Sequence, residues 1–267
     1  MGRTPATVLV VRPRAQALAW VGELAALGVA AQALPLIEIL PAPEPAQVVA
    51  AFASIAASRA QPVLVFVSPN AVAGFFAAAA AEGHALAWPA ETWAAATGPG
   101  TVSALREHGV PADRIVAPPE QGGQFDSEAL WAQIAVWPWA GRPVWIVRGN
   151  GGRDWLGGQL RDAGADVRVV QSYARAAPIL SAPERAALDA ALAEPARWVW
   201  MFSSSEAIAH LQALAPGAHW QAGRAIASHP RIAERARALG FVDVSVIAPS
   251  PAALAEALAA ADRRRAG

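Results

Sequence analysis

The chain contains no cysteine and no lysine, and it has a single tyrosine. Without cysteine, a disulfide framework and thiolate metal sites are excluded. All basic residues are therefore arginines, and these 21 residues balance 21 acidic ones, so that the formal net charge is zero. A neutral chain lacks the basic excess that nucleic acids and anionic membrane surfaces attract. We therefore expect neither nucleic acid nor a membrane as a partner.

Long hydrophobic runs are also absent. The longest apolar stretch, residues 71–81, contains a glycine and is too short to span a bilayer. No charged segment followed by an apolar one opens the sequence, so we expect a cytoplasmic protein. At 267 residues the chain exceeds one average domain, and two compact lobes of about 130 residues each are the natural division.

Short apolar runs indicate the fold class. VLVV at 8–11, VLVFV at 63–67, VWIV at 144–147 and VWMF at 199–202 each lead through a turn into an alanine-rich amphipathic segment. This alternation is typical of a parallel β-sheet covered by helices, and strands without polar alternation fit a sheet that is buried on both faces. The sequence therefore predicts an α/β protein.

The two halves of the sequence resemble each other. Three pairs of segments match in the same order. The segment from Val8 matches that from Val144, and 68–72 matches 204–208, both at an offset of 136 residues. The third pair, 97–110 with 228–241, has an offset of 131 residues. Matches at nearly constant spacing predict a duplicated β/α unit, and two copies favour a pair of similar lobes over a solenoid.

Two proline-containing segments interrupt this rhythm at equivalent places, PLIEILPAPEP at 35–45 and QSYARAAP at 171–178. We interpret them as extended connectors, over 37–41 and 171–177, at which the chain crosses between the lobes. The expected division is then a continuous α/β lobe at 42–170 and a discontinuous α/β lobe made of 1–36 and 178–267.

The glycine-rich segment VRGNGGRDWL at 147–156 is the strongest candidate for a nucleotide site, but it fails both tests. Asp154 stands where a dinucleotide fingerprint needs its third glycine, and a phosphate loop needs a lysine. We expect this turn to hold a different anion or to be structural.

Six polar or glycine-rich turns in the sequence are placed where helices are expected to begin. In open parallel sheets, ligands bind beyond the carboxyl ends of the strands, where main-chain N–H groups favour anions. The candidate ligands in these turns are Arg12, Arg14, Ser68, Asn70, Gly98, Thr101, Arg148, Gly149, Asn150, Gly151, Ser203, Ser204, Ser205, Ser228 and His229. Each serine alone is more simply an ordinary N-cap. Six such turns in two lobes that face a common cleft would suit one polyanionic ligand.

Other catalytic patterns are missing. The sequence has no nucleophile elbow and no histidine or acidic cluster suited to a metal. Tyr173, the single tyrosine, lies in the second connector. Its phenol could donate a proton to a departing hydroxyl, or the side chain could pack with its hydroxyl in water.

Seven of these segments, taken in order, resemble the uroporphyrinogen-III synthase family. They are VLVVRPRAQA with PLIEI, FVSPNAV, TGPGT, VRGNGGRDWL, the SYAR segment, FSSSEAI and HPRIAERARALGF, and together they cover nearly the whole chain.

The resemblance implies two similar α/β lobes joined by two connectors, with no metal and no organic cofactor. It also implies a cyclising hydro-lyase that converts hydroxymethylbilane into uroporphyrinogen III in tetrapyrrole and haem biosynthesis, with loss of water and inversion of ring D. The substrate carries acetate and propionate groups, which the turns would bind, and the tyrosine of the family's connector, its acid candidate, corresponds to Tyr173. We expect a monomer with a possible transient contact with hydroxymethylbilane synthase, the preceding enzyme. The alternatives are a non-catalytic two-lobed tetrapyrrole- or anion-binding module and, less well supported by the motifs, a sugar- or nucleotide-dependent transferase.

Overall fold

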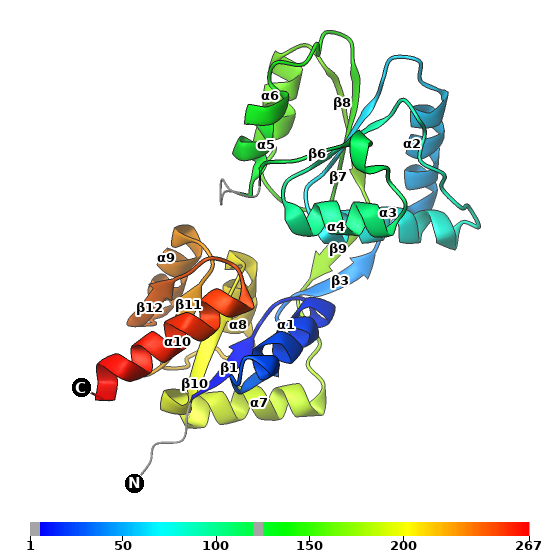
Figure 1. Cartoon of the computed structure of the whole chain (residues 1–267). Helices are drawn as coiled ribbons and strands as arrows, with labels where there is room; N and C mark the ends of the chain where they lie inside the picture. Colours follow the sequence, from blue (N-terminus) through cyan, green and yellow to red (C-terminus); the bar gives the residue numbers. More distant parts are fainter. Residues whose placement is uncertain (1–5, 120–124, 267) are drawn as a thin grey trace. The chain divides into compact units, whose positions relative to one another are not determined.

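Two compact units make up the chain in the computed structural model, which describes residues 6–119 and 125–266. The discontinuous unit comprises residues 1–38 and 176–267, and the continuous unit comprises residues 39–175 (Figure 1). The chain thus passes from one unit to the other near Glu38 and again near Ala176, within the segments expected as connectors.

The discontinuous unit contains a five-stranded parallel sheet in the order β12-β11-β10-β1-β2. Its strands are β1 (Thr7–Val10), β2 (Ala31–Ala33), β10 (Trp198–Phe202), β11 (Arg224–Ala227) and β12 (Asp243–Val246). Its helices are α1 (Arg14–Ala26), α7 (Ala182–Ala193), α8 (Ser205–Leu214), α9 (Pro230–Leu239) and α10 (Pro251–Ala266), with the short 3₁₀ helix η3 (Pro195–Arg197).

The continuous unit contains a second five-stranded parallel sheet, in the order β6-β5-β4-β7-β8. Its strands are β4 (Val63–Phe66), β5 (Trp93–Ala96), β6 (Ile115–Val116), β7 (Pro143–Arg148) and β8 (Asp166–Gln171). Its helices are α2 (Pro45–Ala57), α3 (Pro69–Ala81), α4 (Pro99–Glu107), α5 (Ser127–Ile134) and α6 (Trp155–Asp162), with the 3₁₀ helix η1 (Ala112–Arg114). The predicted α/β class is confirmed in both units.

The internal repeat of the sequence is also seen in the residue-by-residue pairing of the strands. In the discontinuous unit Val8 pairs with Val199, and in the continuous unit Val144 pairs with Val63. Both pairs of equivalent residues are separated by the offset of 136 found in the sequence. The two sheets therefore share strand order and register, as two copies of one β/α unit would.

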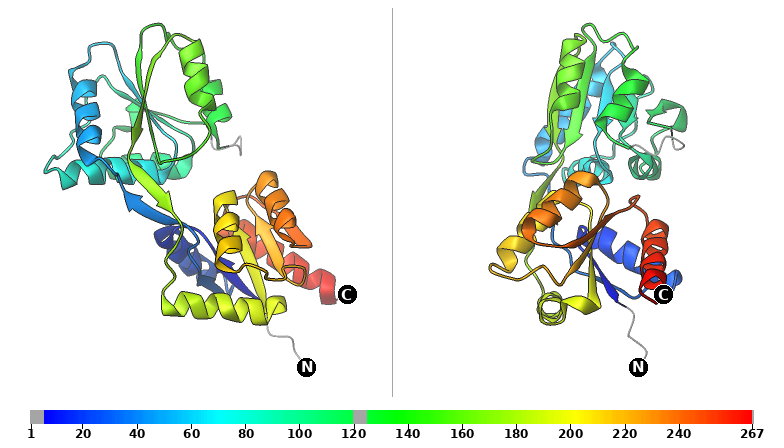
Figure 2. Two further views of the ribbon diagram at one scale, coloured as in Figure 1. Left: turned by 180° about the vertical axis from the view of Figure 1, so that it is seen from behind. Right: turned by 90° about the vertical axis from the view of Figure 1, so that its left-hand side faces the viewer.

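Helices cover both faces of each sheet because every central strand is apolar on both sides (Figure 2). The four residues of β4 are fully buried. In the continuous unit α2, α3 and α4 pack on one face around Phe66 and Phe75, and α5 and α6 pack on the other, where Trp139 is buried. Several helices begin with proline in the first turn, where its missing N–H costs no hydrogen bond.

The segments that link the units are two short strands, β3 (Glu38–Pro41) and β9 (Tyr173–Ala176), which pair with each other in a separate two-stranded sheet. No helix in the described part of the chain has the length and apolar character that a membrane crossing requires.

Candidate functional site

Three of the candidate turns follow neighbouring strands of the continuous unit. Because β5, β4 and β7 are adjacent and parallel, the turns that follow them lie along one edge of the sheet (Figure 1). At this edge lie Gly98 and Thr101, Ser68 and Asn70, and the residues from Arg148 to Gly151, of which Thr101 and Asn70 are in the first turns of α4 and α3.

The discontinuous unit repeats this arrangement with β11, β10 and β1, which are also adjacent and parallel. After these strands lie Ser228 and His229, the run from Ser203 to Ser205, and Arg12 with Arg14, of which Ser205 and Arg14 are the first residues of α8 and α1. Each unit therefore presents its three candidate turns at a single sheet edge, where helix N-termini expose main-chain N–H groups.

Tyr173 is the first residue of β9, and its side chain lies within the continuous unit. It is only 3% exposed and belongs to the apolar cluster around Phe66. Its hydroxyl oxygen lies 3.4 Å from the hydroxyl oxygen of Ser68, the N-cap residue of α3. The structure therefore brings two residues predicted from distant parts of the sequence into hydrogen-bonding range.

A pocket of about 370 Å³ opens beside this tyrosine. One wall is formed by the apolar residues 39–42 together with Pro45, and the other is the small-residue face of α3, which includes Gly74. The polar side chains among the lining residues are those of Asn70 and Tyr173. This is an apolar cavity with few polar groups at its rim, which is the usual form of a small-molecule site.

The turn after β7 contacts the tyrosine from another side. Gly149 lies so close that a β-carbon added to it would be 2.7 Å from Cζ of Tyr173. The next residue, Asn150, uses its side-chain amide to bind the main chain of Arg175, accepting from its N–H at 2.8 Å and donating to its carbonyl at 3.1 Å. Arg175 was not predicted from the sequence, and only its place two residues after Tyr173 could have suggested it.

The remaining polar residues of this edge have mostly structural partners. The Ser68 hydroxyl accepts a hydrogen bond from the N–H of Ala71, as an N-cap does. Gly98 is the N-cap of α4, and a β-carbon there would lie 3.0 Å from Cβ of Phe125. Thr101 is buried in the first turn of that helix.

Arg148 is partly exposed at the end of β7 and lines a smaller pocket of about 140 Å³, together with Gly151 and Arg153. Its guanidinium is 3.7 Å from the carboxylate of Asp154, a loose ion pair. Arg153 binds both oxygens of Glu128 at 2.7 and 2.9 Å, and this hydrogen bonding lowers the pKa of Glu128.

The two arginines that follow β1 differ in their partners. Arg12 packs its guanidinium over the ring of Trp20, at 4.8 Å, and donates to the side chain of Gln16, while burial lowers its pKa. Arg14 instead forms a two-bond ion pair with Glu184, at 2.6 and 3.2 Å. Glu184 was not predicted as a partner, because the two residues are far apart in the sequence.

Glu184 is a buried carboxylate that the fold keeps ionised. Burial by itself raises its pKa, but hydrogen bonds from Arg14 and from the main chain and hydroxyl of Ser181 outweigh this effect and lower it. The hydrogen bond from the Ser181 main chain to Glu184 is also half of a capping box at the start of α7. Arg14 therefore stabilises this unit in addition to any role toward a ligand.

The serine and histidine turns of the discontinuous unit are built as helix caps. Ser204 accepts from the N–H of Glu206 at 3.1 Å, and Nδ1 of His229 accepts from the N–H of Arg231 at 3.1 Å. Ser203 precedes this cap, Ser205 begins α8, and Ser228 donates its N–H to the carbonyl of Phe202.

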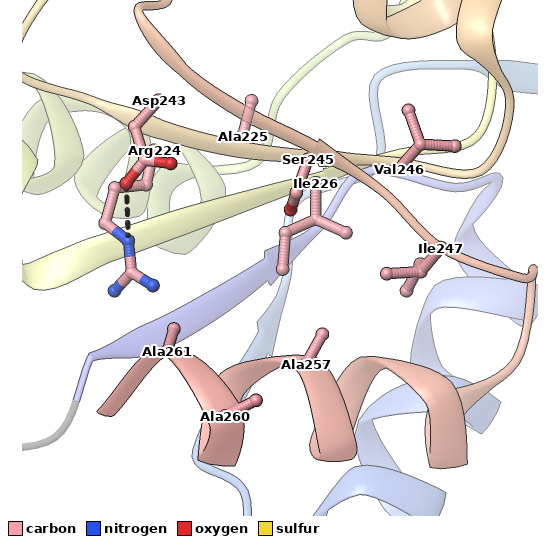
Figure 3. A pocket seen from close by; sticks show the side chains of 10 residues that line it. All are labelled: Arg224, Ala225, Ile226, Asp243, Ser245, Val246, Ile247, Ala257, Ala260 and Ala261. Carbon is pink, nitrogen blue, oxygen red and sulfur yellow. Dashed lines mark ion pairs between the residues drawn. The ribbon is translucent and has the colours of Figure 1, made fainter. Parts of the chain in front are cut away.

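A different pocket of about 400 Å³ lies between α10 and the strands β11 and β12 (Figure 3). Arg224 and Asp243, which line it, are the first residues of their strands. Its lining continues along these strands to Val246 and Ile247 and contains none of the candidate turn residues. Across the described ranges 6–119 and 125–266, no cluster of three or more histidine, aspartate or glutamate side chains is placed to bind a metal ion.

Known proteins with similar sequences share this organisation. A sequence model of the family described as uroporphyrinogen-III synthase HemD matches residues 19–256. The uroporphyrinogen-III synthase of Salmonella typhimurium is 32% identical over 256 residues, which cover 90% of this chain and 94% of that protein. The Escherichia coli protein of the same name is 31% identical, with the same coverage of both chains.

Solved structures show the same fold. A mutant uroporphyrinogen III synthase from Thermus thermophilus aligns with a TM-score of 0.61 and 16% identity, over 97% of this chain and 99% of that one. The Helicobacter pylori uroporphyrinogen-III synthetase aligns with a TM-score of 0.57 and 16% identity, over 96% of this chain and 99% of that one. The family match over most of the length and the two relatives above 30% identity together show that the chain belongs to the uroporphyrinogen-III synthase family.

Proposed function

We propose that this protein converts hydroxymethylbilane into uroporphyrinogen III, with loss of water and inversion of ring D. The observation that carries the proposal is the position of Tyr173, a buried phenol at an apolar pocket beside the carboxyl-edge turns of the continuous unit. Membership of the family supports the same reaction.

The proposed chemistry needs an acid and control of geometry. The substrate hydroxyl leaves as water and gives a cationic azafulvene, and Tyr173 would protonate or hydrogen-bond the departing oxygen. The substituted carbon of ring D is the nucleophile that then adds to this cation, and fragmentation and re-closure invert that ring. Unassisted closure gives the uninverted isomer, so that the protein's main task is to hold the chain curled and to shield the cation from water.

We assign the substrate carboxylates to the turns at the carboxyl edges. The proposed ligands are the polar side chains and main-chain N–H groups of Arg12, Arg14, Ser68, Asn70, Gly98, Thr101, Arg148, Gly151, Ser203, Ser204, Ser205, Ser228 and His229. Arginine pairs with carboxylates through two hydrogen bonds, and N–H groups at helix starts favour anions. The ion pair of Arg14 with Glu184 leaves less of its donor capacity for a ligand.

The direct test supplies hydroxymethylbilane, freshly made by the preceding enzyme, and measures the isomers of the oxidised product. We expect mainly the type III isomer, and an isomer mixture equal to that of the control without protein would refute the proposal. Replacing Tyr173 by phenylalanine should lower kcat by about tenfold or more if the phenol is the acid. If a tetrapyrrole raises the melting temperature of the protein but the protein does not change the isomer ratio of the product, the protein is instead a binding module.

The assembly and location of the protein remain predictions. We expect a monomer in the cytoplasm and a transient contact with hydroxymethylbilane synthase. Light scattering coupled to size-exclusion chromatography, with and without that enzyme, tests the first and the last of these.

A further inference from the structure

We propose that the turn after β7 positions the phenol of Tyr173, and that Gly149 and Asn150 act through this side chain and do not bind a substrate carboxylate. The inference rests on the proposed function only for its effect on turnover. The positioning itself is a property of the protein without substrate.

Gly149 packs directly against the aromatic ring of Tyr173. A β-carbon at this residue would lie 2.7, 2.9 and 3.1 Å from the Cζ, Cε2 and Cε1 atoms of Tyr173, so that any side chain there would overlap the hydroxyl-bearing end of the ring. Carbon atoms pack at about 3.5–4.0 Å. Only glycine therefore lets the ring occupy its observed position.

Asn150 fixes the main chain that carries the tyrosine. Its amide satisfies both the N–H and the carbonyl of Arg175, as a residue of a neighbouring strand would. An amide that is engaged in this way has less capacity to recognise a carboxylate. The Arg175 guanidinium in turn lies over the Tyr173 ring, at 5.9 Å from its centre.

Helix α3 holds the same segment from another side. The hydroxyl of Ser172 donates to the carbonyl of Ala71 at 2.9 Å, and the Ser68 hydroxyl lies 3.4 Å from the phenol oxygen. Ring plane, main chain and hydroxyl are thus each constrained by a different neighbour. An acid that is oriented before the substrate binds avoids the cost of ordering during the reaction.

The single tyrosine makes the positioning directly observable. Growth with 3-fluorotyrosine labels Tyr173 alone, and its ¹⁹F resonance reports the surroundings of the ring. In the Gly149→Ala protein we expect the resonance to move toward that of the free amino acid. The matched control is Gly158→Ala in α6, where an added β-carbon meets nothing within 4 Å, and its resonance should equal that of the wild type. An unchanged resonance in Gly149→Ala would overturn the proposal.

Asn150→Ala provides a second variant at an exposed residue, in case Gly149→Ala does not fold. We expect a shifted or broadened resonance and a kcat lowered by about tenfold, with little change in KM. Asn150→Asp keeps the acceptor for the Arg175 N–H but loses the donor to its carbonyl, so its effect should be intermediate. A raised KM with unchanged kcat and an unchanged resonance would make Asn150 a substrate ligand and refute its positioning role.

A double-mutant cycle separates positioning from other effects. If Gly149 acts through the phenol, Gly149→Ala should lower kcat in the wild type but cause no further loss in Tyr173→Phe. Additive losses would contradict the inference. If the wild-type protein proved inactive, the proposed function would fail, while the ¹⁹F measurement would still decide whether the turn positions the ring.

Discussion

Replacing Gly74 by alanine tests the packing of α3 against the connector. A β-carbon at Gly74 would lie 2.3 Å from the carbonyl oxygen of Ser172 and 2.9 Å from its carbonyl carbon, about 1 Å inside ordinary contact. Both atoms belong to the main chain, and the Ser172 hydroxyl is bonded to α3, so neither partner can move alone. We expect an overpacking cost of about 3 kcal/mol.

Helix propensity acts in the opposite direction, because alanine within a helix is favoured over glycine by about 0.5–1 kcal/mol. The net destabilisation should therefore be about 2 kcal/mol. Gly22→Ala in α1 is the matched control, since an added β-carbon there meets nothing within 4 Å. That variant should gain about 0.5–1 kcal/mol.

Thermal unfolding followed by circular dichroism measures both variants. At about 2–4 °C per kcal/mol, Gly74→Ala should lower the melting temperature by roughly 4–8 °C and Gly22→Ala should raise it slightly. A Gly74→Ala protein that melts at or above the wild-type temperature would show that α3 does not contact the Ser172 carbonyl as described.

Three other changes test the remaining structural claims. Glu184→Gln should destabilise the protein by about 1–3 kcal/mol in urea unfolding at neutral pH, because it weakens the charged hydrogen bonds from Arg14. Since the folded-state pKa of Glu184 lies below its unfolded value, this stabilisation is present above about pH 4.3 and is lost as the pH falls through the folded-state pKa, so wild type and variant should converge in acid; a constant difference would contradict this. Arg142→Gln removes a buried guanidinium that donates to the Gln61 carbonyl at 2.8 Å and packs over two indole rings. We expect the free energy of unfolding to fall, and a decrease of less than about 1 kcal/mol would argue against these contacts. Ser68→Ala should cost about 1 kcal/mol through the lost cap of α3, and its effect on kcat should be absent when Tyr173 is already phenylalanine.

Duplication did not make the two units identical in detail. At the shared offset of 136, the position of Gly74 corresponds to His210, and that of Ser172 corresponds to Leu36. In the continuous unit, Gly74 of α3 has no side chain and packs directly against the Ser172 carbonyl. In the discontinuous unit, Nδ1 of His210 donates a hydrogen bond to the Leu36 carbonyl at 2.6 Å. The equivalent main-chain carbonyl is thus contacted by a helix in both units, but only in the continuous unit is the next residue a tyrosine, Tyr173.

The sequence by itself determined the fold class and the places where turns meet strand ends. Apolar runs of four or five residues, such as that of β4, can be buried only in a covered sheet, and the constant offset between the halves predicted two similar sheets. These features are local or periodic, and they can be read without knowing which distant residues touch.

Only the tertiary structure decided what the candidate residues contact. Ser68 and Gly149 reach Tyr173, Asn150 reaches the main chain of Arg175, and Arg14 reaches Glu184, each across 20 or more positions of the chain. A glycine in the sequence cannot distinguish an anion-binding turn from a residue that packs against an aromatic ring, because both require the absence of a side chain. The distinction depends on what approaches from outside the segment, and the packing of the folded chain alone determines that.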